Sequence, residues 1–300
     1  MACRNIFYLD EVNNLAKTDK ELLVRMSEEM YSNQINELVE DALTKPVKIL
    51  LVAGPSSSGK TTTSNLITKT LQSKNKKSLT ISLDDFFYNR EKTPRLPNGK
   101  YDFENITAID LDYFNEFIND LFTTNHAKMP IFDFVEGRRK PELVDVSIDE
   151  NTYLIIEGLH ALNPTLLNIP RENLYKIYIC VQSNFILGDN LEIDYTNLRL
   201  MRRFNRDYYT RGRTLEGTLD SWDEVLIGEK LYIDPYKDEA DYNIDSTLMY
   251  EPLLFANYLK PLLKKSDLPK IKEVEKMLEN CSILSKDIIP SNSLLNEFIY

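Results

Sequence analysis

One loop constrains the fold of this 300-residue chain more than any other feature. The apolar run "VKILLVAG", residues 47–54, leads through "PSSSG" into "KTTTSNLITKTLQSK", which reads as a helix. Residues 54–61 fit the pattern GxxxxGK[ST] without a mismatch, although the chain has only 9 glycines. A buried strand, this loop and a helix in that order favour a phosphate-binding loop over a simple polar turn.

The residue types of this loop suit phosphate chemistry. Its glycines allow a tight turn whose backbone N–H groups converge, and the next helix adds its positive N-terminal end. We expect Lys60 to reach the β- and γ-phosphates of ATP and Thr61 to ligate Mg²⁺, so ATP and Mg²⁺ are the predicted cofactors. The residues expected to bind the nucleotide here are Gly54, Ser56, Ser57, Ser58, Gly59, Lys60, Thr61 and Thr62.

Strand-like and helix-like segments alternate along the chain. Apolar runs typical of buried strands occupy residues 47–54, 77–87, 151–162, 174–181 and 240–246. Helical patterns occupy residues 20–43, 61–74, 110–122, 195–211 and 252–264. This alternation predicts an α/β fold with a mainly parallel sheet, in which ligands bind at the carboxyl ends of the strands.

Acidic residues end two of the expected strands. Asp84 and Asp85 follow "TISL", and Glu157 ends "YLII", a Walker-B-like strand. Such acids often only cap a loop, but phosphoryl transfer to an alcohol needs a carboxylate near Mg²⁺ that accepts the hydroxyl proton. We therefore expect Asp84, ahead of Asp85, to be the general base, and Thr61, Asp84 and Glu157 to be the metal ligands. The two histidines, His126 and His160, are interpreted as structural or surface residues.

The segment "LRLMRRFNRDYYTRGRT", residues 198–214, is rich in arginine although the protein is acidic. A charge run of this kind is usually a solvated helix face. Six arginines with one acid among them would repel one another unless they met anions, and arginine suits bidentate contacts with phosphate. We therefore favour a lid that closes over phosphates. Its arginines are Arg199, Arg202, Arg203, Arg206, Arg211 and Arg213.

Composition limits the partners, the metal sites and the location that we expect for the protein. The net charge of −11 argues against general binding to nucleic acid or to an anionic membrane, so no such partner is expected. Cys3, Cys180 and Cys281 lie far apart, without the spacing of a zinc site or a disulfide framework. The N-terminal residues lack the apolar core of a signal peptide, and no run is long enough to span a membrane. We expect a cytoplasmic protein.

Several segments, in this order, resemble the uridine kinase and phosphoribulokinase group of P-loop kinases: "GPSSSGKTT", "SLDDFF", "YDFENITAID", "PIFDF", "IIEGLHAL" and "RRFNRDYYTRGR". The resemblance covers about residues 47–265. It implies a five-stranded, NMP-kinase-like parallel sheet with helices on both faces, an Arg-rich lid, and a nucleoside 5′-hydroxyl as acceptor. It also suggests a homodimer or homotetramer.

The same resemblance suggests three parts of the chain. These are an N-terminal helical extension (1–46), the kinase domain (47–265) and a C-terminal helical tail packed on that domain (266–300). The ending "IPSNSLLNEFI" is similar to the tail of a bacterial nucleoside-kinase branch.

Residue roles follow from the resemblance at matching positions. It implies that Asp84 is the base, that Glu104 holds the sugar hydroxyls, and that aromatic side chains surround the nucleoside base. Lys60 and Arg206 join Asp84 as catalytic residues, and Arg203 and Arg211 contact the nucleotide. The implied substrate-binding residues are Phe87, Glu104, Phe132, Phe134, Arg206 and Arg213.

Three departures from that group weaken the expectation of uridine. Phe87 stands where a tyrosine is usual, Gly137 stands where a base-reading histidine is typical, and residues 181–197 replace a much shorter link. A site that loses base-reading polar groups has a relaxed or redirected specificity. Two alternatives therefore stay open: a kinase of another small alcohol, such as a sugar phosphate or a pantothenate-like acceptor, and a non-catalytic ATP-binding regulator that works through the N-terminal helix.

Overall fold

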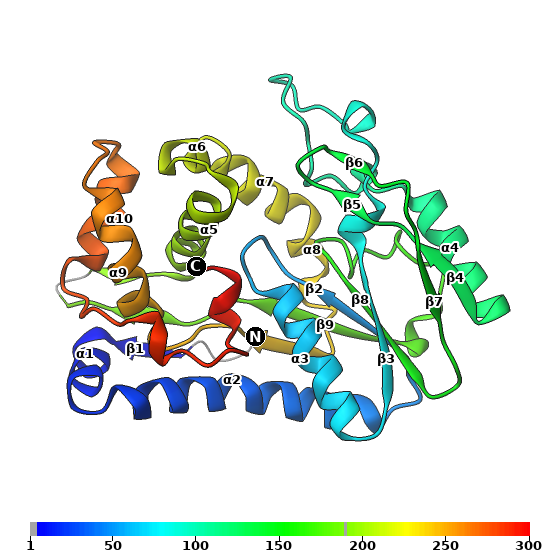
Figure 1. The fold of residues 1–300 in the computed structure, drawn as a ribbon, viewed down its shortest axis with the longest axis horizontal. Helices are drawn as coiled ribbons and strands as arrows, with labels where there is room; N and C mark the ends of the chain where they lie inside the picture. The colour runs from blue at the N-terminus through cyan, green and yellow to red at the C-terminus, as the bar shows by residue number, and fades with distance from the viewer. Residues whose placement is uncertain (1–4, 189–190) are drawn as a thin grey trace.

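A five-stranded sheet forms the centre of the computed structural model, which describes residues 5–188 and 191–300 (Figure 1). All of its strands run parallel, in the order β12-β9-β2-β8-β3. The predicted α/β fold is therefore confirmed, and each strand falls inside a range expected from the sequence. The strands are β2 (Ile49–Ala53), β3 (Lys77–Ser82), β8 (Thr152–Glu157), β9 (Leu174–Cys180) and β12 (Tyr242–Asp245).

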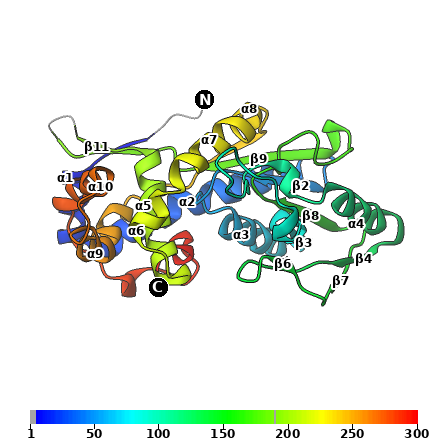
Figure 2. The same ribbon diagram turned by 90° about the horizontal axis from the view of Figure 1, so that it is seen from above.

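Both faces of this sheet are covered by helices because alternate side chains of each strand point to opposite faces. In β2, Leu50 and Val52 join a core that includes side chains of α2 (Lys20–Leu43), α3 (Lys60–Ser73) and α9 (Glu251–Leu263). Leu51 and Ala53 join a second core with α4 (Leu111–Thr124), which lies at the other end of the molecule from α9 (Figures 1 and 2). The continuous apolar run of β2 reflects this double burial.

The helices expected at 20–43 and 195–211 have those bounds in the structure, as α2 and α5 (Tyr195–Arg211). Asp19 and Asp194 cap their N-termini by accepting hydrogen bonds from backbone N–H groups. Helices α1 (Leu9–Thr18) and α10 (Pro269–Glu279) fall in the extension and the tail that were expected to be helical, although their bounds were not predicted. Further helices were not predicted: α6 (Leu215–Leu219), α7 (Trp222–Tyr232) and α8 (Asp234–Lys237).

Three small sheets were also not predicted. In the first, β1 (Ile6–Tyr8) pairs in parallel with β10 (Asn184–Ile186), which pairs with β11 (Glu192–Ile193). The long link before α5 thus joins the N-terminal segment to the body of the protein. The others pair β4 (His126–Met129) with β7 (Val144–Ser147) and β5 (Phe132–Asp133) with β6 (Arg138–Arg139).

The larger core contains both ends of the chain. Leu38 of α2, Leu259 of α9 and Phe298 near the C-terminus are all fully buried in it. Cys180 and Cys281 are buried free thiols, whereas Cys3 lies outside the described residues. In the described part of the chain, each helix is too short or too polar to cross a membrane.

Candidate active site

The loop between β2 and α3 has the geometry of a phosphate cradle. Gly59 has φ 92° and Ser57 has φ 62°, so the chain turns sharply before α3 begins. A Cβ on Gly54 would lie 2.1 Å from the carbonyl oxygen of Ile179, so only glycine fits there. The buried hydroxyls of Ser57 and Ser58 have no hydrogen-bond partner among the described residues, as expected of groups that await a ligand.

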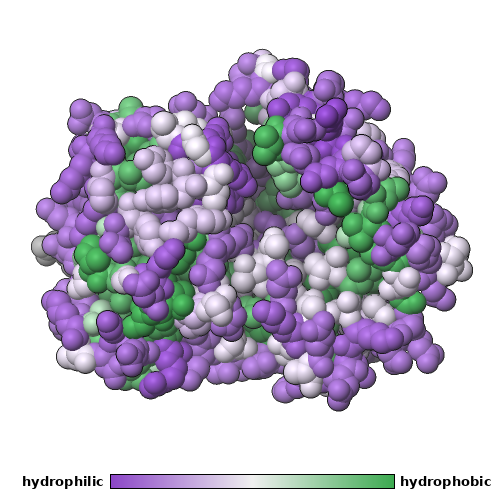
Figure 3. Space-filling model, in the orientation of Figure 1, coloured by the Kyte–Doolittle hydropathy of each residue, from purple (hydrophilic) through white to green (hydrophobic). Residues whose placement is uncertain are grey.

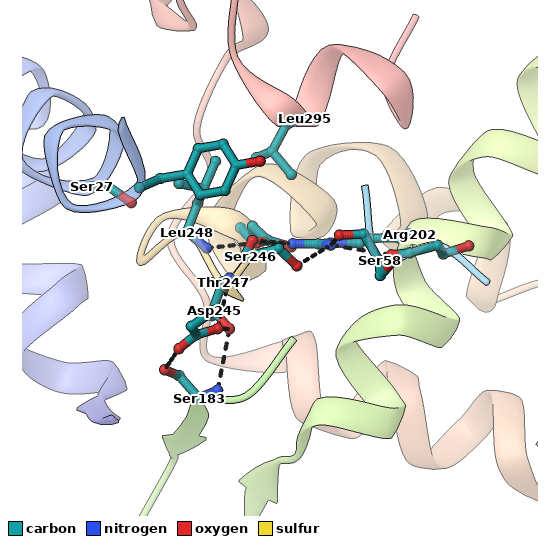
Figure 4. A network of polar contacts seen from close by, with 12 residues as sticks. Ser27, Ser58, Ser183, Arg202, Asp245, Ser246, Thr247, Leu248 and Leu295 are labelled. Carbon is teal, nitrogen blue, oxygen red and sulfur yellow. Dashed lines mark hydrogen bonds and ion pairs between the residues drawn. The ribbon is translucent and has the colours of Figure 1, made fainter. Parts of the chain in front are cut away.

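Arg202 of α5 binds the carbonyl oxygens of this loop (Figure 4). Its guanidinium is fully buried and donates to the carbonyl oxygens of Ser57 (3.1 Å) and Ser58 (3.4 Å). The same group donates to the carbonyl oxygen of Ser246 and to the Glu251 carboxylate, both at 2.6 Å. The loop's carbonyls are therefore tied to the protein, which leaves its N–H groups for an anion.

A hydroxyl and carboxylates meet where the predicted Mg²⁺ would lie. Thr61 Oγ1 is 3.4 Å from Glu157 Oε1, and the Ser82 hydroxyl donates to the same oxygen at 2.7 Å. Burial and, next, the nearby Asp84 carboxylate raise the pKa of Glu157 to about 7. The described residues include no cluster of three His, Cys, Asp or Glu side chains arranged for a metal, but a Thr hydroxyl with two carboxylates fits a hard cation such as Mg²⁺.

Asp84 lies in the 3-10 turn η1 (Leu83–Phe86), not on the strand itself, because β3 ends at Ser82. Partial burial raises the pKa of Asp84, while the positive charges of Lys60, Arg211 and Arg206 oppose that shift. Asp85 points elsewhere and accepts the backbone N–H of Phe132 at 3.0 Å. The turn separates them, and Asp84 is the acid beside the loop lysine.

Glu104 lies close enough to Lys60 and Asp84 for their charges to shift its pKa. Burial raises its pKa to about 7, and the charges of Arg203 and Lys60 oppose the shift. Helix α7 packs tightly on it, because a Cβ on Gly228 would lie 2.5 Å from Glu104 Cβ. Figure 3 shows a hollow in the molecular surface between the part that carries α5 and α7 and the part that carries β5 and β6.

Aromatic side chains gather beside Glu104. The ring of Phe87 contacts the rings of Phe103 and Phe132, with centroids 6.4 and 5.9 Å apart. Phe134 stacks edge-on against Phe132 and remains 59% exposed, so it presents a free aromatic face. At Gly137, whose φ is 70°, a Cβ would collide with the Arg90 side chain.

The arginines of α5 divide into two groups. Arg199 and Arg202 are fully buried and form ion pairs with Glu229 and Glu251. For these two, the expectation of a phosphate-binding lid was wrong, because the anions they meet are carboxylates from segments well beyond α5. The arginine-rich segment itself contains only one acid, Asp207, so its sequence does not reveal these partners.

The other four arginines of residues 198–214 are not fully buried. Arg203 donates to Ser56 Oγ at 2.9 Å, and burial lowers its pKa to about 10. Arg206 (2.9 Å) and Arg211 (3.5 Å) both pair with Asp207. Arg213 is exposed and donates to the carbonyl oxygen of Gly217. Asp207 thus forms ion pairs with Arg206 and Arg211, and the charges of these two arginines also act on Asp84.

Two residues near the site were not predicted to function there. His160 is 1% exposed beside the Tyr232 ring, and burial lowers its pKa to about 4. Glu297, from the C-terminal tail, accepts a hydrogen bond from the hydroxyl of Thr62 at 2.9 Å. No spacing or motif in the sequence signals this contact between residues 235 positions apart.

Comparison with known proteins supports the resemblance seen in the sequence. The model of the phosphoribulokinase/uridine kinase family matches residues 49–250. Three uridine kinases are among the similar proteins. The one from Schizosaccharomyces pombe is 30% identical over 61% of this chain and 36% of its own length. The one from Saccharomyces cerevisiae is 27% identical over 83% and 48%. The one from Borrelia hermsii is 28% identical over 65% and 84%.

The matched region therefore spans less than half of each yeast relative's length and most of the Borrelia relative. The family match covers the phosphate loop, both acidic strand ends and the whole of α5. On this evidence of sequence and fold, the chain belongs to the phosphoribulokinase/uridine kinase family.

Proposed function

We propose that this protein is an ATP-dependent kinase that transfers the γ-phosphate of ATP to the 5′-hydroxyl of a nucleoside. The observation that carries the proposal is the position of Asp84: its carboxylate lies in the field of Lys60, Arg206 and Arg211. A carboxylate beside the loop lysine is placed to accept a hydroxyl proton as the phosphoryl group arrives. Burial raises the pKa of Asp84, and these three cations oppose that rise and so favour the ionised form that a base needs.

In this mechanism the protein positions charge around the transferred group. Lys60, Arg206 and Arg211 stabilise the negative charge that develops on the phosphoryl oxygens. Mg²⁺, held by Thr61, Asp84 and Glu157, would supply neutralisation of the phosphate charge when bound. Arg203 fixes the Ser56 hydroxyl at the start of the loop. We assign Glu104 to the sugar hydroxyls, since a carboxylate accepts two such hydrogen bonds.

The aromatic side chains favour an acceptor that carries a nucleoside base at the end away from the reacting hydroxyl. Phe132 is buried behind Phe134, whose exposed ring offers a stacking surface. Phe87 and Gly137 bring no polar side-chain group to this surface, so hydrogen-bond selection among bases is expected to be weak. The proposal is therefore a nucleoside kinase, with uridine and cytidine as the first candidates.

The test is a substrate panel with Mg-ATP, read by mass spectrometry. We expect a nucleoside to gain one phosphate, and Lys60→Ala to abolish the product. The panel also contains sugar phosphates and pantothenate. A product only from these would replace the nucleoside with another alcohol. ATP binding without transfer to any acceptor would reject the kinase and leave the regulator.

A further inference from the structure

The C-terminal segment, residues 293–300, lies against the phosphate loop at Gly59 and against α5 at Asn205. This segment is outside residues 49–250, the region that matches the family model. It is nevertheless built firmly into the protein. Asn205 of α5 donates to the carbonyl oxygen of Phe298 at 2.6 Å, and the Ser293 hydroxyl is 3.0 Å from the hydroxyl of Tyr250.

Two residues of this segment touch the loop and the first turn of α3 that follows it. Leu294 packs on Gly59 so closely that a Cβ on the glycine would lie 2.2 Å from Leu294 Cδ1. Glu297 accepts the hydroxyl hydrogen of Thr62 through Oε2. Among the described residues, no hydrogen bond reaches the other oxygen, Oε1. A half-buried carboxylate with a free oxygen therefore borders the cradle.

The direction of the donor nucleotide follows from the acceptor side. Asp84 and Glu104 mark where the acceptor hydroxyl lies, and in-line transfer puts the leaving β-phosphate on the opposite side of the γ-phosphate. The α-phosphate and ribose must continue away from Asp84. Consecutive residues of a helix point about 100° apart, so Thr61 faces Glu157 while Thr62 faces Glu297. Glu297 therefore lies on a different side of α3 from Glu157, although its charge still reaches Glu157, and we place the tail on the nucleoside side of the donor.

We propose that the C-terminal segment forms the ribose wall of the ATP site and that Glu297 accepts hydrogen bonds from the ribose hydroxyls. The inference rests on the proposed use of ATP. A carboxylate suits a vicinal diol because its two oxygens accept from two neighbouring hydroxyls. A carboxylate is ill suited to phosphate, since like charges repel. Ribose is the part of the donor next to the phosphates that offers hydroxyl donors.

The experiment measures equilibrium binding to the full chain by calorimetry, without acceptor, for ATP, 2′-deoxy-ATP and 3′-deoxy-ATP. Hydrogen bonds to a charged group predict that at least one deoxynucleotide binds wild type about tenfold more weakly than ATP. Glu297→Ala should bind ATP about tenfold more weakly and no longer distinguish it from that deoxynucleotide. Glu273→Ala, which removes the same charge from the surface of α10, should keep the wild-type pattern.

Equal binding of all three nucleotides by wild type would overturn the ribose contact while leaving the kinase proposal intact. Tighter ATP binding by Glu297→Ala would overturn it in favour of a carboxylate that obstructs the loop. Failure of wild type to bind ATP at all would overturn both proposals. If the alanine variant does not fold, Glu297→Gln keeps the shape of the side chain, and it should reduce the ATP preference without abolishing it.

Discussion

Asp84 is the residue on which the proposed chemistry depends most directly. Asp84→Asn removes the proton acceptor but keeps the shape and a polar group beside Lys60. Since general-base catalysis contributes about a hundredfold to ten-thousandfold, kcat should fall by about a hundredfold or more. The affinity for ATP should change little, because the loop and the arginines remain and the amide oxygen of asparagine can still ligate Mg²⁺. Steady-state kinetics and calorimetry measure the two effects separately.

Asp85→Asn is the matched control. Its amide oxygen can still accept the Phe132 N–H, so the turn should keep its shape and kcat should fall far less. A larger loss from Asp85→Asn than from Asp84→Asn would exchange the two roles. Turnover that survives Asp84→Asn would remove Asp84 from the proton step.

His160 provides a test of burial through pH. Its pKa is lowered from 6.5 to about 4, so the folded protein resists a proton that the unfolded chain accepts. Between pH 7 and pH 5 this difference favours the unfolded state, by about 2 kcal/mol. His160→Gln removes the titrating group. We expect the free energy of unfolding of this variant, relative to wild type, to rise by about that amount on acidification from pH 7 to pH 5.

The chain offers a control in its one other histidine. His126→Gln, at a histidine with 51% of its side chain accessible, is the control for the loss of an exposed histidine. Urea denaturation at pH 5, 6 and 7 gives the comparison. A parallel pH dependence in wild type and His160→Gln would mean that His160 is protonated in the folded protein at pH 5.

Some site residues could be predicted from a local motif, some only from the family resemblance, and some not at all. The loop from Gly54 to Thr61 could be predicted because one local pattern carries its chemistry. Glu104 and Phe134 came only from the family resemblance, since neither stands in a diagnostic spacing. Glu297 could not be predicted, because its contact with Thr62 joins segments whose distance in space is set by the whole fold.

Among the helices, α5 ties the phosphate loop to the rest of the protein. Arg202→Met leaves the Glu251 carboxylate buried without its cation and frees the carbonyl oxygens of Ser57 and Ser58. Because an unpaired buried charge is costly, the free energy of unfolding should fall by about 3 kcal/mol or more. The double variant with Glu251→Met should regain much of this loss. Urea denaturation measures both.

The control on the same segment is Arg213→Met, which changes an exposed arginine beyond the end of α5. Surface changes of this kind alter stability by about 0.5 kcal/mol or less. A similar small loss in Arg202→Met would show that the buried ion pair contributes little. A double variant no more stable than Arg202→Met would place the loss in the loop carbonyls instead.

Some helices and strands could be predicted from the sequence, and others could not. The five central strands and the long helices could be predicted because each keeps its apolar pattern over enough residues to reveal its period. The strands β1, β10 and β11 are two or three residues long, which is too short for any period. The pairing of β1 with β10 joins Ile6 to Asn184, so it depends on how the whole chain folds. The roles of Arg199 and Arg202 were missed for the same reason, since their partner acids lie on later elements.

At the scale of the whole molecule, the N-terminal extension shares one core with the kinase fold. Tyr31 of α2 is buried and its hydroxyl lies 2.6 Å from the hydroxyl of Thr63, in the first turn of α3. Leu38 of α2 is fully buried in the same core as Phe298 of the tail. We propose that the residues before 47 and after 265 unfold together with the region between them, and do not form separate units.

A single core of this kind predicts that a destabilising substitution in the N-terminal extension also affects ATP binding at the active site. Leu38→Ala removes fully buried methyl groups and should lower the free energy of unfolding by about 2–5 kcal/mol. Met30→Ala, on the exposed side of the same helix, should cost far less. If the chain unfolds as one unit, loss of ATP binding and loss of helical signal follow the same urea curve in Leu38→Ala, shifted to lower urea. Two separate transitions, with ATP binding retained after the first, would instead make the extension an independent unit and return it to the regulatory role that its position also allows.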